Sequence, residues 1–210
     1  MRVDDVPLPL APAFHAYGYL VGGALHGVVT LIRRGCRLER AAPAQVDGPV
    51  IDCFWHEHLP AYIAAFLPGR PQRTYAWMNH PIWFMRPVHV LLALNGVERL
   101  ALGSTGHGGQ AALEKVAGFL RDGCSTSLAV DGPTGPPRQL KRGALDLALA
   151  TGRPLVAIRF EYQRALRAPG WDRKWLPLPG STVRAVESAP IFAAPEGVEA
   201  ARAAVLAGLG

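Results

Sequence analysis

Residues 125–160 read STSLAVDGPTGPPRQLKRGALDLALATGRPLVAIRF. Residues 126–130 form a short apolar run, typical of a buried strand, and the run stops abruptly at Asp131. A basic loop rich in glycine and proline follows, then a helical pattern at 144–150 closed by Gly152, then a second apolar strand at 155–160. This order predicts a βαβ crossover, whose polar loops lie at the carboxyl ends of parallel strands, where open α/β sheets bind ligands. Taken alone, the residues also fit an acidic turn followed by solvated basic side chains.

The rest of the chain repeats this alternation. Strands are expected at 50–55, 74–78, 98–102 and 183–186, and helices at 59–66, 84–94, 110–121 and 196–209. Four successive strands end in polar or glycine-rich loops, at His56, Asn79, Gly103 and Asp131. The sequence therefore predicts a single α/β domain with a mostly parallel central sheet flanked by helices and one functional edge.

Length and composition narrow the class of protein. With 210 residues, half of them hydrophobic, the chain suits one domain with a sizeable core. The three cysteines, Cys36, Cys53 and Cys124, are scattered without metal-ligand spacing, which indicates free thiols in a reducing compartment. Residues 133–175 hold nine Lys or Arg against three acidic residues, an excess that suits an anionic substrate, carrier or lipid headgroup. The aromatic residues do not interleave with the arginines, so a nucleic-acid partner is not expected.

The N-terminal segment carries a separate signal. Residues 13–32 contain no Asp, Glu, Lys or Arg, and Arg33 and Arg34 follow directly. The length is close to that of a bilayer span, but four glycines and two histidines favour a helix lying in the membrane interface. The acidic start, Asp4-Asp5, argues against a signal peptide. We expect residues 1–45 to be a membrane-associating segment and residues 46–210 to be the α/β domain; the alternative is a helix packed on the domain itself.

Several ordered blocks carry a resemblance to a known family. The motif Asp131-Gly132-Pro133-x-Gly135-Pro136 is followed by a basic helix start and by residues 152–158, GRPLVAI. Three further blocks accompany this motif: Trp55-His56, the glycine-rich segment 103–109, and WDRKWLPLP at 171–179. Together these blocks resemble the lysophospholipid (glycerol-phosphate) acyltransferase superfamily, from about residue 50 to residue 192. It is most similar to an uncharacterised bacterial branch in which Pro-Asp-Gly-Pro-Arg-Gly-Pro replaces the usual Pro-Glu-Gly-Thr-Arg block.

The resemblance implies a histidine base. Members of the superfamily use His-x4-Asp/Glu, in which the acid orients the histidine that removes the acceptor's proton. By order and by the preceding Trp55, His56 matches this histidine, but the position of the acid is Ala61. Glu57, or Asp131 from a neighbouring strand, is expected to orient His56 instead, and His80 is a second candidate base.

The resemblance also implies a site for the acceptor. Gly103 and Ser104 lead into a glycine-rich turn before a helix, where backbone N–H groups can hold an anion. Together with Gly132 of the Asp-Gly-Pro block, Arg138 and Lys141, they are expected to position the acceptor. A glycine-rich turn that only permits tight packing is the alternative.

These observations predict an acyltransferase that moves a fatty acyl group from an acyl carrier protein or coenzyme A thioester to a lysophospholipid-like or other lipid acceptor. The thioester is a co-substrate and no cofactor or metal is expected; the protein would lie peripherally on the cytoplasmic face of the inner membrane. A non-catalytic acyl- or phospholipid-binding member of the fold that has lost the dyad is the first alternative. A metal-assisted hydrolase built on His56 and His58 is the second, since alternate residues of a strand share a face.

Overall fold

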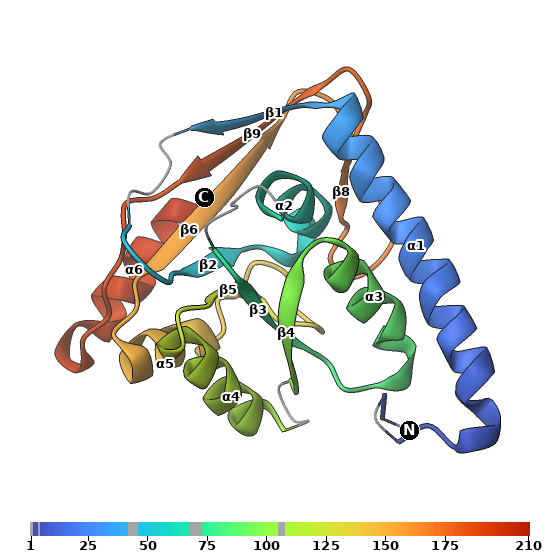
Figure 1. Cartoon of the computed structure of the whole chain (residues 1–210). Coiled ribbons are helices and arrows are strands. Elements are labelled where there is room, and N and C mark those ends of the chain that lie inside the picture. Colours follow the sequence, from blue (N-terminus) through green and yellow to red (C-terminus); the bar gives the residue numbers. More distant parts are fainter. Residues whose placement is uncertain (1, 4, 42–45, 68–72, 105–107) are drawn as a thin grey trace.

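A central sheet organises the computed structural model of the chain, which describes residues 2–3, 5–41, 46–67, 73–104 and 108–210 (Figure 1). Within these residues the sheet has seven strands in the order β1-β9-β6-β2-β5-β3-β4. All neighbours pair in parallel except β6 and β9, which are antiparallel. The strands are β1 (Arg37–Ala41), β2 (Ile51–Phe54), β3 (Tyr75–Asn79), β4 (Val97–Leu102), β5 (Ser125–Ala129), β6 (Leu155–Tyr162) and β9 (Thr182–Glu187).

Helices cover both faces of this sheet. On one face α2 (Leu59–Phe66) and α3 (Arg86–Leu94) pack against β2, β3 and β6. On the other, α4 (Gly109–Arg121), α5 (Gly143–Thr151) and α6 (Val198–Leu209) do the same. Strand β2 shows why: Ile51 and Cys53 join the core under α4–α6, Phe54 joins the core under α2, and all are fully buried. A strand buried on both faces is expected to be a near-continuous apolar run, and β2 is one except at Asp52, whose Oδ2 accepts the hydroxyl of Tyr62 at 2.7 Å.

The long helix α1 (Ala11–Gly35) lies along α3 at the outside of the molecule (Figure 1). Its buried residues fall on one stripe, and Gly18 and Gly22 lie where α1 meets α3. A Cβ at Gly22 would lie 2.7 Å from the backbone oxygen of Pro87 and from Cβ of Val90. At its C-terminal end, Arg33 donates to the carbonyl oxygen of Ala64 at 3.3 Å and to Oδ1 of Asn95 at 3.0 Å. One of the arginines expected near lipid headgroups is therefore engaged with α2 and α3.

The opposite face of α1 is apolar and exposed. Tyr19, Leu20 and Leu31 are each more than 60% exposed, and Trp83 and Phe84 of the 3-10 helix η3 (Trp83–Met85) are also exposed. Among the described residues, no helix has both the length and the hydropathy that a membrane span requires. The predicted N-terminal helix is present, with one face packed on the domain and the other open.

The predicted mostly parallel sheet flanked by helices is confirmed, including the four strands that end at one edge. Three strands were not predicted: β1, β7 (Ala165–Arg167) and β8 (Trp175–Pro177). Strand β1 reads RLERA and lies at the edge of the sheet, where alternating charges hide the apolar signal. The strands β7 and β8 form a separate two-stranded ribbon of three residues each, too short for a period to be visible. Short 3-10 helices also occur at η1 (Leu8–Leu10), η2 (His56–His58) and η4 (Pro195–Gly197).

Candidate active site

The carboxyl ends of β2, β5, β3 and β4 lie next to one another at one edge of the sheet. This order brings together residues that are far apart in the sequence. His56 follows β2, Asp131 and Gly132 follow β5, His80 follows β3, and Gly103 and Ser104 follow β4. The parallel pairing thus places most of the predicted site residues along one row, as the sequence indicated.

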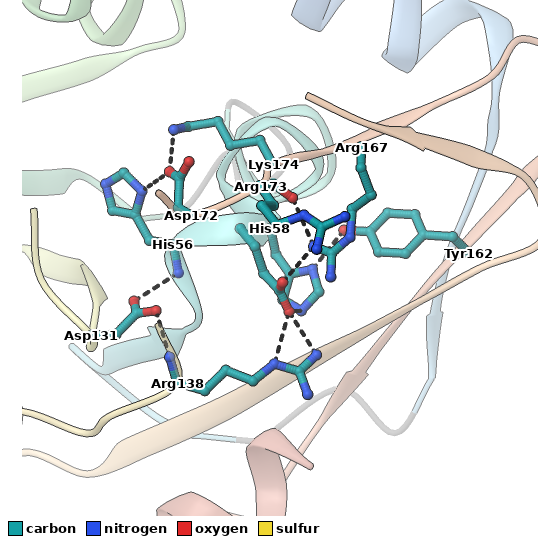
Figure 2. A network of polar contacts seen from close by, with 10 residues as sticks. His56, His58, Asp131, Arg138, Tyr162, Arg167, Asp172, Arg173 and Lys174 are labelled. Atoms are coloured by element: carbon teal, nitrogen blue, oxygen red, sulfur yellow. Dashed lines mark hydrogen bonds and ion pairs between the residues drawn. The ribbon is translucent and has the colours of Figure 1, made fainter. Parts of the chain in front are cut away.

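His56 is held at two points (Figure 2). Its backbone N–H donates to Oδ1 of Asp131 at 2.9 Å, and its ring Nδ1 lies 2.5 Å from Oδ2 of Asp172. Burial opposes ionisation of Asp172, but hydrogen bonds from His56 and Lys174 outweigh it and lower the pKa of Asp172 to about 2. An ionised carboxylate only accepts hydrogen bonds, so Nδ1 donates to it, which in a neutral imidazole leaves the lone pair on Nε2. The side chain of His56 is 20% exposed, while that of Asp172 is 4% exposed.

Asp172 is therefore the acid that faces His56, from the loop between β7 and β8. The sequence pointed to Asp131 or Glu57 for this role, and the structure gives each of them different partners. Both carboxylate oxygens of Asp131 accept backbone N–H groups, from His56 and from Arg138, the latter at 3.0 Å. Asp131 thus fixes the position of the loop that carries the histidine, and not the orientation of the ring.

Glu57 is buried and forms an ion cluster with Arg138 and Arg167, the two arginines labelled in Figure 2. Arg138 donates to Glu57 Oε1 at 2.7 Å and Arg167 to Oε2 at 2.6 Å. Burial opposes the ionisation of Glu57, yet the hydrogen bonds from Arg167 and Arg138 outweigh it and lower its pKa. Nδ1 of His58 lies 2.8 Å from the hydroxyl of Tyr162, and burial lowers the pKa of His58 to about 4. This cluster joins η2 to the ribbon and to the loop after β5.

These contacts bear on the metal alternative. His56 and His58 lie in η2, not on a strand, and their rings contact Asp172 and Tyr162 respectively. Within the described ranges, no group of three or more His, Cys, Asp or Glu side chains is arranged to hold a metal ion.

A cavity of about 460 Å³ opens in front of His56. His80, Gly103, Ser104 and Gly132 line it beside His56, and Lys174 stands at its wall. The remaining lining is mostly apolar and comes from α2, α3, β3 and β5: Leu59, Ile63, Trp77, Val88, Leu92 and Leu128 among others. The cavity can therefore hold an apolar chain with one end at the imidazole.

A second cavity, of about 530 Å³, lies on the other side of the strand ends, between α4 and α5. The partition between the two cavities consists of the residues that line both: Met78, Ser104, Leu128, Ala129, Gly132 and Pro133. Lys141 lines the second cavity, and a Cβ at Gly132 would lie 2.6 Å from its ammonium nitrogen. Gly132 also has a φ of +70°, so a side chain here would be strained as well as crowded.

Arg138 does not line the cavity that Lys141 lines. Its guanidinium pairs with Glu57 and lines a third cavity, of about 690 Å³, with His58, Tyr162 and Trp175. The glycine-rich segment is described only in part, because residues 105–107 lie outside the described residues. Of the five residues expected to bind the acceptor, four therefore line the two joined cavities, and Arg138 belongs to the ion cluster around Glu57.

Comparisons with known proteins agree with this fold. No protein-family model matches the chain. The uncharacterized protein RP090 of Rickettsia prowazekii (strain Madrid E) is 28% identical over 142 residues, a match that covers 68% of this chain and 63% of that relative's length. Among solved structures, the 1-acyl-sn-glycerophosphate (LPA) acyltransferase PlsC from Thermotoga maritima has a TM-score of 0.55 at 17% identity, with 93% of this chain and 81% of that chain covered. The chain therefore has an α/β fold similar to that of the acyltransferase PlsC.

Proposed function

We propose that this protein is an acyltransferase that moves a fatty acyl group from an acyl carrier protein or coenzyme A thioester to a lipid-like acceptor. The observation that carries the proposal is the His56–Asp172 pair at the mouth of an apolar cavity. The similarity in fold to PlsC supports the same reaction class.

The pair supplies a general base. Nε2 of His56 removes the proton from the acceptor hydroxyl as its oxygen attacks the thioester carbonyl. The imidazolium formed is stabilised by Asp172, which is already ionised and already hydrogen-bonded to Nδ1. No covalent enzyme intermediate is required, because the acceptor itself is the nucleophile.

The two cavities suit a substrate that is both apolar and anionic. The cavity between the His56 edge and the helices α2 and α3 has apolar walls, which fits an acyl chain. Lys141 stands at the partition and has no ion-pair partner among the described residues, so its ammonium is available to an anionic headgroup. The Lys141→Ala variant should raise the acceptor KM, and added salt should weaken acceptor binding by the parent because exposed charges are screened.

Membrane contact is part of the proposal. The exposed apolar face of α1 continues into Trp83 and Phe84, both on the side of the molecule where α3 begins. An amphipathic helix with such a face binds the interface without crossing the bilayer. This arrangement supports peripheral attachment, which we place at the cytoplasmic face of the inner membrane.

A screen of thioester donors and lipid extracts read by mass spectrometry tests the proposal. The parent should form a new acylated lipid, and His56→Ala should lower kcat by about 10²–10⁴-fold with little change in KM. His80→Ala is the matched variant, since His80 lines the same cavity and its Nδ1 accepts the backbone N–H of Ile82 at 3.2 Å. If His80→Ala abolishes turnover and His56→Ala does not, the base is assigned to the wrong strand end. If the parent binds acyl lipids but transfers no acyl group, the non-catalytic alternative holds.

A further inference from the structure

The side-chain amide of Asn79, the last residue of β3, has a hydrogen-bond partner for its oxygen but none among the described residues for its nitrogen. Its side-chain oxygen accepts the backbone N–H of His80 at 2.8 Å. A backbone N–H only donates, so this contact fixes which end of the amide is oxygen. The amide nitrogen Nδ2 is buried and has no hydrogen-bond partner among the described residues. Asn79 is only 7% exposed and lines the same cavity as His56.

Ser104 repeats this pattern on the neighbouring strand. The residue is 3% exposed, lines the cavity, and its Oγ is buried without a partner among the residues that the structure describes. The two strand ends are joined directly, because the N–H of Gly103 donates to the backbone oxygen of Asn79 at 2.8 Å. Two neutral donors thus lie at the ends of neighbouring strands, at the edge that carries the imidazole.

Such donors are costly unless something binds them. A buried polar group left without a partner costs about 1–3 kcal/mol, and most buried polar groups in folded proteins are paired. Both groups are uncharged, which suits an oxygen that becomes negative only during the reaction better than it suits a permanent phosphate. The cation suited to a permanent anion, Lys141, lines the cavity on the other side of the partition.

We propose that Asn79 Nδ2 and Ser104 Oγ form the oxyanion-binding pair of this site. The inference rests on the proposed acyl transfer. The acceptor O–H gives its proton to Nε2 of His56, the acceptor oxygen bonds to the thioester carbonyl carbon, and the carbonyl electron pair moves to oxygen. That oxyanion accepts hydrogen bonds from Asn79 and Ser104. When the C=O bond re-forms, the C–S bond breaks and the thiolate takes the proton back from His56, giving an ester and a free thiol.

The Asn79→Asp substitution separates this role from a structural one. A carboxylate at position 79 still accepts the N–H of His80 but no longer donates, whereas Asn79→Ala loses both functions. Removing one oxyanion donor typically lowers kcat by about 10²–10³-fold. We expect both variants to show a loss of that order, with the affinity for an acyl thioether, a donor analogue without the carbonyl oxygen, unchanged. Ser104→Ala should show a loss in kcat of the same kind.

The matched control is Asn95→Asp. Asn95 is equally buried, but its amide donates to the carbonyl oxygen of Leu91 at 2.8 Å and accepts from Arg33, and it lies outside the cavity. This variant should lose stability and keep the kcat of the parent. The proposal is overturned if Asn79→Asp turns over like the parent, if only Asn79→Ala is impaired, or if Asn95→Asp lowers kcat equally. If the parent protein transfers no acyl group, the proposed acyltransferase function itself is refuted. If the parent is active and His56→Ala is not, acyl transfer stands, and the Asn79 and Ser104 variants then test the oxyanion-binding pair alone.

Discussion

The contact between Asp172 and His56 allows a quantitative prediction. Oδ2 of Asp172 accepts from two donors at once, Nδ1 of His56 and the ammonium of Lys174. In Asp172→Asn the ammonium, which can only donate, keeps the amide oxygen at this position, so the imidazole retains Nδ1–H and the correct tautomer. Only the charge is lost.

The size of that loss follows from the pKa of Asp172. It is about 2, against an ordinary 3.8, and each pKa unit corresponds to about 1.4 kcal/mol. This net shift corresponds to about 2.4 kcal/mol, and because burial opposes it, the hydrogen bonds from His56 and Lys174 together contribute more than that. Replacing a charged hydrogen-bond partner of the histidine by a neutral one costs about 1 kcal/mol. Because the side chain is 4% exposed, solvent screening is small. Asp172→Asn should therefore lower kcat only about 5–10-fold.

Removing the ammonium changes this outcome. In an Asp172→Asn, Lys174→Met double variant the amide can turn its NH₂ toward Nδ1, which moves the ring proton to Nε2 and blocks the base. The kcat should then fall by about 10²–10⁴-fold, as expected for loss of a general base. Lys174→Met alone, which leaves the carboxylate in place, is the control. The kcat values of the parent, both single variants and the double variant form a double-mutant cycle that gives the coupling between Asp172 and Lys174. Melting temperatures show whether each variant is folded. A 10³-fold loss in Asp172→Asn alone, or a double variant no worse than the product of the single ones, would refute this account.

Three further predictions concern two buried histidines (His58 of η2 and His89 of α3), the carboxylate of Glu57, and the exposed face of α1. Burial and nearby arginines lower the pKa values of His58 and His89 to about 4, so stability is complete above pH 6.5 and falls as pH drops toward 4, by about 2 kcal/mol for each histidine at pH 5. Urea midpoints at pH 7 and pH 5 measure this loss, and His89→Leu should halve it. Glu57→Gln leaves Arg138 and Arg167 without their carboxylate and should lower the free energy of unfolding by about 1–3 kcal/mol. The kcat of this variant at 25 °C should stay close to that of the parent. A kcat loss as large as that of His56→Ala would instead make Glu57 the partner of the histidine. Replacing Leu20 and Leu31 by Ser should abolish co-sedimentation with anionic vesicles, and unchanged sedimentation would exclude this face of α1 as the contact.

The sequence predicted the central sheet because its strands are apolar runs bounded by glycine, proline and polar residues. The same boundaries predicted that the polar strand ends, His56 among them, meet at one edge of the sheet. It did not locate Asp172, because the acid reaches His56 from 116 positions away, in a basic loop without any period. The Trp171-Asp172-Arg173 block was visible as part of the resemblance, but nothing in its spacing indicated contact with β2. Nor did the pattern show that His56–His58 turn into a 3-10 helix, which sends the two rings to different partners.

The ribbon β7–β8 has a consequence for how the protein responds to heat. His56 directly follows strand β2 of the seven-stranded sheet, whereas Asp172 lies in the loop that joins the two three-residue strands of the ribbon. The ribbon is attached to the sheet through Arg167, which pairs with Glu57, and through Trp175, which stacks on Tyr162. Small units of this kind open locally at a lower free energy than the whole domain. Thermal inactivation should therefore precede the loss of the far-ultraviolet circular dichroism signal, and the gap between the two curves measures how tightly the ribbon is attached.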